Sequence, residues 1–472
     1  MPQATLTIGN SETSPLAPMT ASIINRFILL LDDSLSALGA KVPMTSVEQL
    51  AMNIQASMEH GLRVYHGSSH VLDLCEGMNP RQTLAALYHD LAYVQLDDGF
   101  PEHAASLLRS VVFDASGTLT LRQADPADTG LALCLGVFGL KGGDALPVYG
   151  AMNEFLSAVI AVRTLSGYLA PADLLAIVAC IEATIPFRSC DVQGREPAER
   201  LAERLRQTGA ALQIPLDAFA IDTMVLDAVM LANRDVGGFA VDDQALFLSR
   251  TWMLIEESNA PLTRVGTFSA QDYRKALMRM EDFLATLNPA SIFQRFHGQP
   301  SDSEMQRLCR LAKANLDFAV LYLGAKVAAT AIIEALALET GGNAPMSMFL
   351  GDLRGIDGTR PVRVEDFLPR PDSFDDLDTR LLEVLEKGRG KESSNDLNAS
   401  PLTAFLYRSL GDDGMRALIG QARQMFAGTL TPVAFLLSLP KLPVIAIIDG
   451  CRHIAISRVD RLEALRARIE QS

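Results

Sequence analysis

Histidine is scarce in this sequence, yet most of its histidines gather in one short region. The chain has seven histidines in 472 residues, and five of them lie between His60 and His103. The stretch YHGSSH, residues 65–70, holds two of these, and LAALYHDLAY, residues 84–93, holds a third with an aspartate directly behind it. Imidazole and carboxylate groups are the usual protein ligands of divalent transition metals. The cluster therefore predicts a metal site.

The pair His89 and Asp90 carries most of this prediction, because it stands in a strongly apolar run. An ionisable pair buried among apolar side chains is costly unless it is paired internally or bound to a metal. The structural alternative is an internal ion pair, with His66 and His70 as ordinary surface residues. For any one of these residues that alternative is favoured, but for the set in this spacing we favour a metal site.

The elements that must position these residues are expected to be helices. Hydrophobic residues make up 49% of the chain and aromatic residues only 6%, with Leu and Ala prominent, which favours an all-α fold. Apolar residues repeat at intervals of three and four over 20–38, 46–65, 152–169, 172–185, 196–212, 222–235, 245–258, 269–287 and 303–339. Strand-like alternation is not evident before residue 430, and the run within 432–450 is expected to be a strand-like or buried segment. A break near Gly67 is compatible with the sequence GSS.

The predicted organisation follows composition along the chain. Residues 1–20 resemble a disordered lead, 21–300 a helical domain, for which the resemblance given below implies a catalytic role, and 301–350 a helical extension of it. Residues 351–400 are charged and rich in Pro and Gly, which predicts a loop or linker with one helix at 375–387. Residues 401–472 form a C-terminal helical region, whose amphipathic last helix is compatible with a homodimer contact.

Charge and hydropathy restrict the classes of partner. A net charge of −15 makes the chain a poor match for duplex nucleic acid or an anionic membrane surface. The start of the sequence lacks the features of a secretory signal. The most apolar runs, 316–339 and 432–450, are interrupted by charged residues or prolines, so buried helices rather than membrane spans are expected. We therefore expect a cytoplasmic protein without a membrane partner.

The histidine motifs resemble those of the HD-domain metal-dependent phosphohydrolases, most closely the class I cyclic-nucleotide phosphodiesterase branch. The first motif of that branch has the form YHNxxHxxDV, and this chain has YHGSSHVLDL; the second is an apolar run ending in HD, and this chain has LAALYHD. The downstream aspartate motif is best matched by ANRDVGG, residues 232–238, and a tryptophan helix with paired acids by WMLIEE, residues 252–257. The resemblance covers about residues 25–290 and implies an HD-like multi-helix domain.

The resemblance implies roles for individual residues. It implies metal ligation by His70, His89, Asp90 and Asp235, with Asp90 bridging if two ions bind, general-acid catalysis by His66, and contact of Glu154 with metal-bound water. The cofactor would be one or two divalent ions among Mn, Fe, Zn, Co and Ni, with Mg allowed at a second site. Such an ion would lower the pKa of its water, and a histidine is suited to protonate the leaving oxygen. For Asp235 the alternative is a capping or turn residue, and for Glu154 an ordinary half-exposed glutamate.

Two further residues are candidates for substrate binding. Asp97 follows the His-Asp helix and would lie at the mouth of the metal site, although a plain turn before Gly99 is the simpler explanation. Arg188, beside a proline, would clamp a phosphate through two hydrogen bonds, or else be an ordinary surface arginine.

The sequence departs from the family pattern at two places. The family's HDxxH is HDLAY here, so that Tyr93 replaces a histidine, and the asparagine of YHN is Gly67. A nucleobase-reading glutamine after the tryptophan helix was not identified either. These departures favour a general phosphohydrolase over a strictly cyclic-nucleotide enzyme.

The expected function is hydrolysis of a nucleotide or another small phosphoester, as in a phosphodiesterase. Two alternatives remain open. One is a non-catalytic, nucleotide-sensing module on an HD fold, and the other is a His/Asp di-iron oxygenase of HD type, whose turnover would depend on O2.

Overall fold

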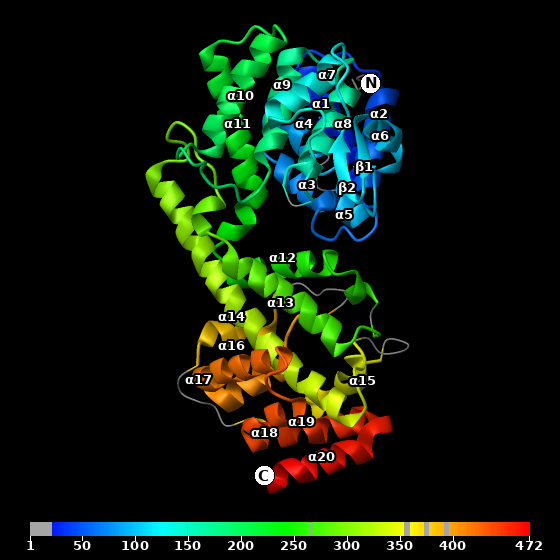
Figure 1. The fold of residues 1–472 in the computed structure, drawn as a ribbon, viewed down its shortest axis with the longest axis vertical. Coiled ribbons are helices and arrows are strands. Elements are labelled where there is room, and N and C mark those ends of the chain that lie inside the picture. Colours follow the sequence, from blue (N-terminus) through cyan, green and yellow to red (C-terminus); the bar gives the residue numbers. More distant parts are fainter. Residues whose placement is uncertain (1–20, 149, 265, 354–358, 372–376, 391–395) are drawn as a thin grey trace, which may run out of the picture.

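The fold was obtained as a computed structural model that describes residues 21–472 except 149, 265, 354–358, 372–376 and 391–395 (Figure 1). The predicted lead, residues 1–20, lies outside the described residues. The all-α prediction is confirmed, because helices form nearly all the regular structure of the described chain. Its strands, β1 (Val112–Ala115) and β2 (Thr118–Leu121), form one antiparallel hairpin.

The first half of the chain contains the helices α1 (Ile23–Ala37), α2 (Met44–Met58), α3 (Ser68–Cys75), α4 (Pro80–Tyr88), α5 (Val94–Asp97), α6 (Ala105–Val111), α7 (Thr129–Phe138), α8 (Met152–Leu165), α9 (Pro171–Ala183), α10 (Pro197–Ala211) and α11 (Ala218–Asp235). The second half contains α12 (Gln244–Glu257), α13 (Ala270–Thr286), α14 (Asp302–Thr340), α15 (Ser347–Leu350), α16 (Thr379–Lys387), α17 (Pro401–Phe426), α18 (Pro432–Ser438), α19 (Lys441–Ile454) and α20 (Val459–Gln471). A short 3-10 helix, η3 (Val236–Ala240), joins α11 to the second half.

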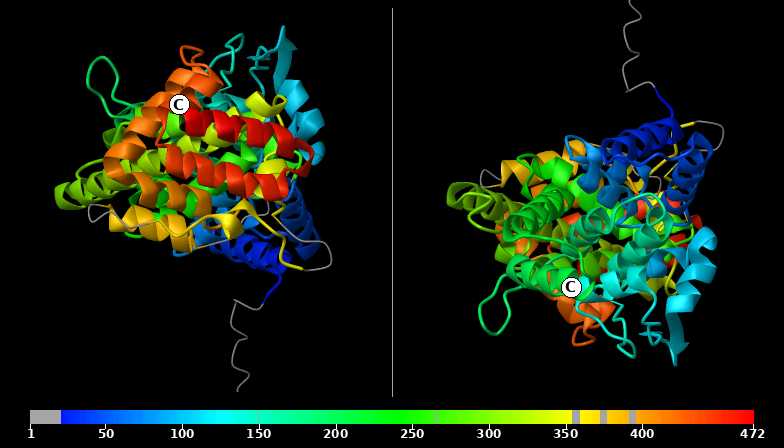
Figure 2. Two further views of the ribbon diagram at one scale, coloured as in Figure 1. Left: turned by 90° about the horizontal axis from the view of Figure 1, so that it is seen from below. Right: turned by 90° about the horizontal axis from the view of Figure 1, so that it is seen from above.

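The buried apolar side chains form two separate cores. One runs from Phe27 to Ala232 and includes Phe296, whereas the other runs from Ala240 to Ile469. We call the parts built on them the first lobe (α1–α11) and the second lobe (η3–α20); they are the upper and lower parts of Figure 1. Viewed from below, α19 and α20 lie across the far end of the second lobe (Figure 2). The cores divide near residue 236, so α12 and α13 belong to the second core although the sequence analysis grouped them with 21–300.

The second lobe is organised around the long helix α14, which packs against α13 and α17. This is the one helix in the described part of the chain that is long and apolar enough to cross a membrane. However, 83% of its most apolar window is buried inside the protein. The expectation that this run is a buried helix therefore agrees with its packing.

The run within 432–450 forms the helices α18 and α19 with buried side chains, which agrees with the expectation of buried helices and not with a strand-like segment. Two local predictions were wrong. The β1–β2 hairpin lies before residue 430, where no strand was predicted, because its four-residue strands turn at Ser116 and Gly117 and are too short to show a clear alternation. The helix predicted over 46–65 ends at Met58, and the chain then turns at Gly61, which has a positive φ of 60°. In the predicted linker, α16 begins at Thr379, and residues 375 and 376 lie outside the described residues.

Because the cores are separate, we expect thermal unfolding in two transitions. Leu175 on α9 and Leu336 on α14 are both fully buried, one in each core. Each change to alanine should cost about 2–5 kcal/mol through lost contacts and a cavity. Leu175→Ala should lower the midpoint of one transition and Leu336→Ala that of the other, measured by differential scanning calorimetry. A single transition that both variants lower equally would show that the two lobes unfold as one unit.

Candidate metal centre

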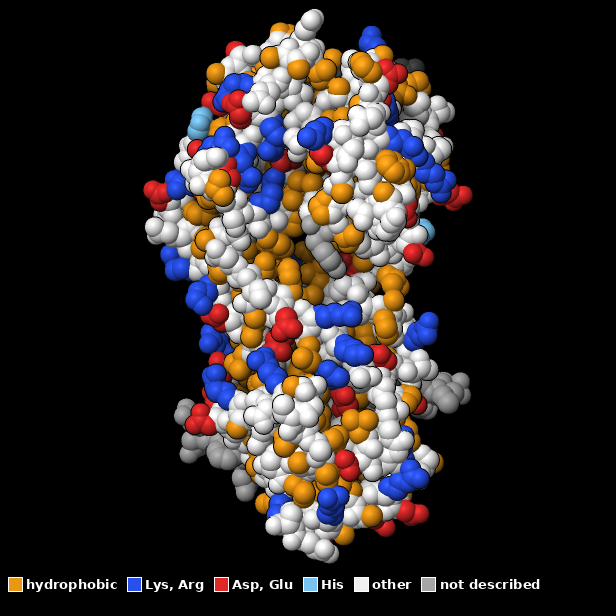
Figure 3. All heavy atoms as spheres, in the orientation of Figure 1, with side chains coloured by type: hydrophobic (Ala, Val, Ile, Leu, Met, Phe, Trp, Pro, Cys, Tyr) orange, Lys and Arg blue, Asp and Glu red, His pale blue; other side chains and the backbone are white. Residues whose placement is uncertain are grey.

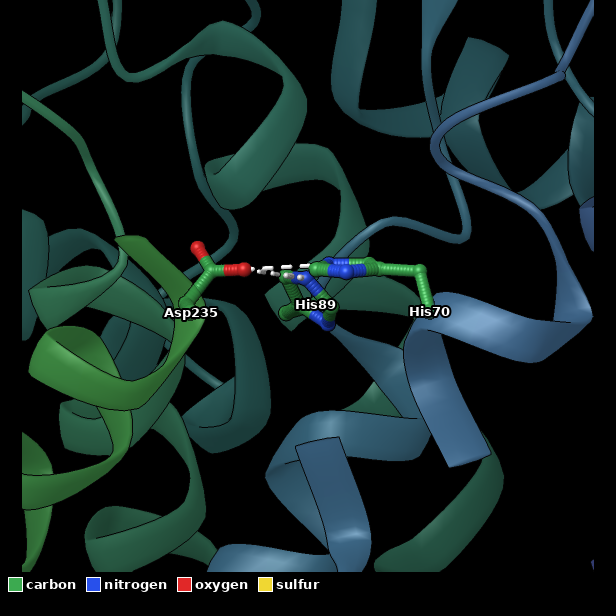
Figure 4. A group of neighbouring side chains, drawn as sticks. All are labelled: His70, His89 and Asp235. Atoms are coloured by element: carbon green, nitrogen blue, oxygen red, sulfur yellow. Dashed lines mark ion pairs between the residues drawn. The ribbon is translucent and has the colours of Figure 1, made fainter. Parts of the chain in front are cut away.

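Three elements of the first lobe bring the predicted ligands together. His70 lies on α3, His89 directly follows α4, and Asp235 is the last residue of α11. Each offers one ligand atom, and these atoms lie within 4.8 Å of one another. The carboxylate of Asp235 and the ring of His70 point toward each other, with His89 beside them (Figure 4).

The distances are those of a compact donor set. Nε2 of His70 is 3.0 Å from Oδ1 of Asp235, and Nε2 of His89 is 3.8 Å from the same oxygen. Asp90 joins the set through its Oδ2, which is 3.0 Å from Nε2 of His89. The four side chains are nearly buried, His89 most completely, with 2% of its side chain exposed. Two imidazoles and two carboxylates suit a divalent transition metal.

The hydrogen bonds fit a metal better than a closed ion-pair network. Nδ1 of His89 lies 2.8 Å from the carbonyl oxygen of Ala86. A carbonyl can only accept, so the proton is on Nδ1, and the lone pair of Nε2 faces the carboxylates. Nε2 of both His70 and His89 is buried and makes no hydrogen bond of acceptable geometry with any residue in the described part of the chain. Buried polar atoms of this kind are rare without a partner, and a cation would supply one.

Without a cation, protons take its place. Burial alone would lower the pKa of His89, but the adjacent Asp90 carboxylate, with help from Asp235, raises it to about 10. Burial would raise the pKa of Asp90, but the charge and hydrogen bond of His89 lower it well below the ordinary value. The carboxylates therefore favour a positive charge between them, whether it is a proton or a metal ion.

His66 lies beside this set and is held by the second lobe. Its Nδ1 is 2.5 Å from Oε1 of Glu257, at the end of α12. The other oxygen of Glu257 accepts the backbone N–H groups of Val64, Tyr65 and His66 at 2.8–3.0 Å. Burial would lower the pKa of His66, but the hydrogen bond to Glu257 outweighs it and the pKa is raised. The contact with Glu257 therefore favours the protonated form of His66.

The local sequence explains why His66 is presented in this way. The chain leaves α2 after Met58, takes a left-handed conformation at Gly61, and enters α3 after the N-cap residue Gly67. Residues 64–66 are thus outside any helix, and their amides are free for one carboxylate. The predicted break near Gly67 is present. The ring of Tyr93, which stands where the family has a histidine, packs edge-on against His66 with ring centroids 4.9 Å apart.

Glu154 projects from the first turn of α8 toward the same region. Its Oε2 atom is buried and has no hydrogen-bond partner among the described residues. Burial, assisted by the charge of Asp90, raises the pKa of Glu154 to about 7. Glu154 is partly buried, and its pKa suits a group that takes up or gives a proton at neutral pH.

The two predicted substrate-binding residues are engaged in internal ion pairs. Arg188 donates to both oxygens of Glu182, at 2.5 and 3.3 Å, and Glu182 has only 2% of its side chain exposed. Asp97 accepts two hydrogen bonds from Arg63, at 2.9 and 2.6 Å, with 3% of its side chain exposed. The placement of Asp97 at the metal mouth was therefore wrong, because a buried cation occupies both of its oxygens.

The sequence analysis missed two residues that the site depends on. Glu257 was visible only as one of the paired acids in WMLIEE, and nothing in the sequence links it to the distant His66. Arg63 was not considered, yet its guanidinium also donates to the carbonyls of Asp90 and Leu91 at 2.6 and 3.4 Å. The pair of Arg63 and Asp97 thus fixes the backbone that carries the His-Asp motif.

Comparison of the chain with models of protein families, with curated proteins and with solved structures finds no match. The resemblance to the HD-domain phosphohydrolases therefore stays a prediction from the short motifs.

The buried pair predicts a large effect on stability. Asp97→Asn would leave the fully buried Arg63 without its counter-charge, which typically costs about 3–5 kcal/mol. Asp317→Asn is a matched control, because its pair with Lys313 is 65% exposed on both sides, so less than about 1 kcal/mol should be lost. Urea unfolding would measure both. Equal losses of unfolding free energy would mean that the buried pair of Arg63 and Asp97 contributes no more to stability than the exposed pair.

Proposed function

We propose that this protein is a metal-dependent phosphohydrolase acting on a small phosphoester. The observation that carries the proposal is the donor set of His70, His89 and Asp235, with His66 beside it in contact with the Glu257 carboxylate. His70, His89 and Asp235, with Asp90, would hold one or two divalent ions. When bound, such an ion lowers the pKa of a coordinated water and neutralises charge on the phosphoryl oxygens.

The chain's own residues supply the proton transfers. His66 holds a proton that Glu257 stabilises, and it donates this proton to the departing oxygen of the ester. Glu257 also keeps the imidazole in one orientation, since the carboxylate is itself fixed by three backbone amides. Glu154, with a pKa of about 7, is suited to accept a proton from the attacking water.

Metal content is the first test. Wild-type protein should contain one or two transition-metal ions per chain by elemental mass spectrometry, and Asp90→Ala should lose them. His60→Ala is the control, because that side chain is 60% exposed and lies outside the donor set, so its metal content should stay as in wild type. If wild type stays metal-free after reconstitution, the proposal is wrong.

The metal-loaded protein would then be assayed on p-nitrophenyl phosphate and bis(p-nitrophenyl) phosphate, with and without oxygen. Hydrolysis that is independent of oxygen supports the proposal. Turnover that requires O2 would instead favour the di-iron oxygenase, and binding of a nucleotide without turnover would favour the sensing module.

The pair of His66 and Glu257 makes a second prediction. His66→Gln should lower kcat by about 10²- to 10⁴-fold, because the leaving oxygen loses its acid. Glu257→Gln should lower kcat by about 10- to 100-fold, an effect of the size seen for groups that orient a reacting side chain. Metal content should be unchanged in both variants. Glu203→Gln, on the exposed face of α10, is the control and should match wild type.

The pH–rate profile separates an electrostatic role of Glu257 from a structural one. Since Glu257 raises the pKa of His66, activity that needs the acid form is lost as pH rises through that pKa. Removing the carboxylate lowers the pKa, so the alkaline limb of the Glu257→Gln profile should move to lower pH. If the alkaline limb of the profile stays where it is in wild type, Glu257 does not raise the pKa of His66.

A further inference from the structure

A cavity of about 600 Å³ opens beside the donor set, where the two lobes meet. It is lined by Tyr65, His70, Asp235, Gly238, Arg250 and Met253, among others. In the orientation of Figure 3 the surface is hollowed between the lobes, with hydrophobic side chains exposed in the hollow. The cavity volume is within the range of pockets that bind small organic ligands.

Arg250 is unusual among the cavity's charged residues. It lies on α12 and is partly buried, yet it forms no ion pair or hydrogen bond through its side chain with any residue that the structure describes. By contrast, Arg234 in the same cavity donates to the carbonyl of Asp73 at 2.9 Å and lies 3.5 Å from a carboxylate oxygen of Glu76. A partly buried guanidinium without an acid partner is suited to an anionic ligand.

Arg250 lies beside Gly238 and Tyr65 in the cavity that His70 and Asp235 also line. A β-carbon at Gly238 would lie 3.2 Å from Nη1 of Arg250 and 3.8 Å from the hydroxyl of Tyr65. The guanidinium and the hydroxyl therefore flank one point of the cavity, and Gly238 leaves room for both. Gly238 is only three residues beyond Asp235, and the ring of Tyr65 is 5.2 Å from that of His70, centroid to centroid. Two hydrogen-bond donors, the guanidinium of Arg250 and the hydroxyl of Tyr65, thus lie in the cavity beside the donor set.

The cavity also has acidic residues, Asp73 and Glu76, which we call the acidic rim. Both are exposed on and just after α3, and 86% of the Glu76 side chain is accessible. Arg234 offsets part of their charge. An anionic group that reached past Arg250 to the acidic rim would meet negative charge, which opposes binding of a polyphosphate.

We propose that Arg250 and the hydroxyl of Tyr65 hold the non-bridging oxygens of the phosphoryl group presented to His70, His89 and Asp235. The substrates are esters with one phosphoryl group on an uncharged body, and the acidic rim selects against polyphosphates. This inference rests on the proposed phosphohydrolase function and makes Arg250 its specificity-determining residue.

The test compares adenosine mono-, di- and triphosphate and p-nitrophenyl phosphate on metal-loaded wild type, Arg250→Gln and Arg250→Lys. Arg250→Gln should raise KM for the monophosphate and for p-nitrophenyl phosphate by about 10- to 100-fold, the usual effect of losing a charge-assisted hydrogen bond, with a smaller change in kcat. Arg250→Lys should recover part of this loss, because it restores charge but not the two-pronged geometry. Arg307→Gln, on the surface of α14, is the matched control and should behave as wild type.

The acidic rim is tested separately. Wild type should bind the monophosphate more tightly than the triphosphate in calorimetric titrations, and Asp73→Asn should narrow this difference. Tighter binding of the triphosphate by wild type would overturn the predicted substrate class.

The inference and the proposed function fail in different ways. If wild type hydrolyses the esters and Arg250→Gln keeps its KM, the role of Arg250 is overturned and the hydrolase function stands. If wild type binds the monophosphate through Arg250 without turnover, the anion site is supported and the hydrolase function falls. If wild type neither binds nor hydrolyses any of these compounds, both are overturned.

Discussion

The carboxylate of Glu257 is the contact on which the rest of the site depends. One oxygen gathers three consecutive backbone N–H groups and the other holds the ring of His66, so a single side chain from the second lobe fixes a non-helical segment of the first. The amides could otherwise have continued α2. A nearly buried carboxylate with four donors keeps its negative charge, and this charge in turn keeps a proton on His66.

A second buried ion pair, Arg63 with Asp97, acts in the same way on the backbone beside the proposed metal ligands. Arg63 donates to the carbonyls of Asp90 and Leu91, in and just after the His-Asp motif, and Asp97 neutralises its charge. In both cases a charged side chain holds a stretch of backbone that lies outside a helix. The proposed ligands lie at or near helix ends, so the backbone beside them has to be fixed by contacts other than helical hydrogen bonds. The helices supply rigidity, and the buried ions set the positions of the groups between them.

The sequence was informative where the signal is local. The helical class follows from apolar periodicity, and the approach of His70, His89 and Asp235 agrees with the motifs that suggested it. Partners far apart in the chain were not predictable: Glu257 lies 191 residues from His66, and no pattern near either residue indicates the other. For the same reason, Asp97 was placed at the metal mouth, since its partner Arg63 could not be read from the acidic turn. The boundary at 300 followed the extent of the family resemblance, about residues 25–290, whereas the cores divide near η3.

The division into two cores has a consequence for how the protein is made. His70, His89, Asp90 and Asp235 all precede residue 236, whereas Glu257 and Arg250 follow it. Domains generally fold as units while the chain leaves the ribosome, the N-terminal one first. The four proposed ligands therefore leave the ribosome before Glu257 and Arg250 do, and before Phe296, which completes the first core. Under the proposed function, His66 and Arg250 would act only after the second lobe has packed against the first, so the order of synthesis sets the order in which the site is completed.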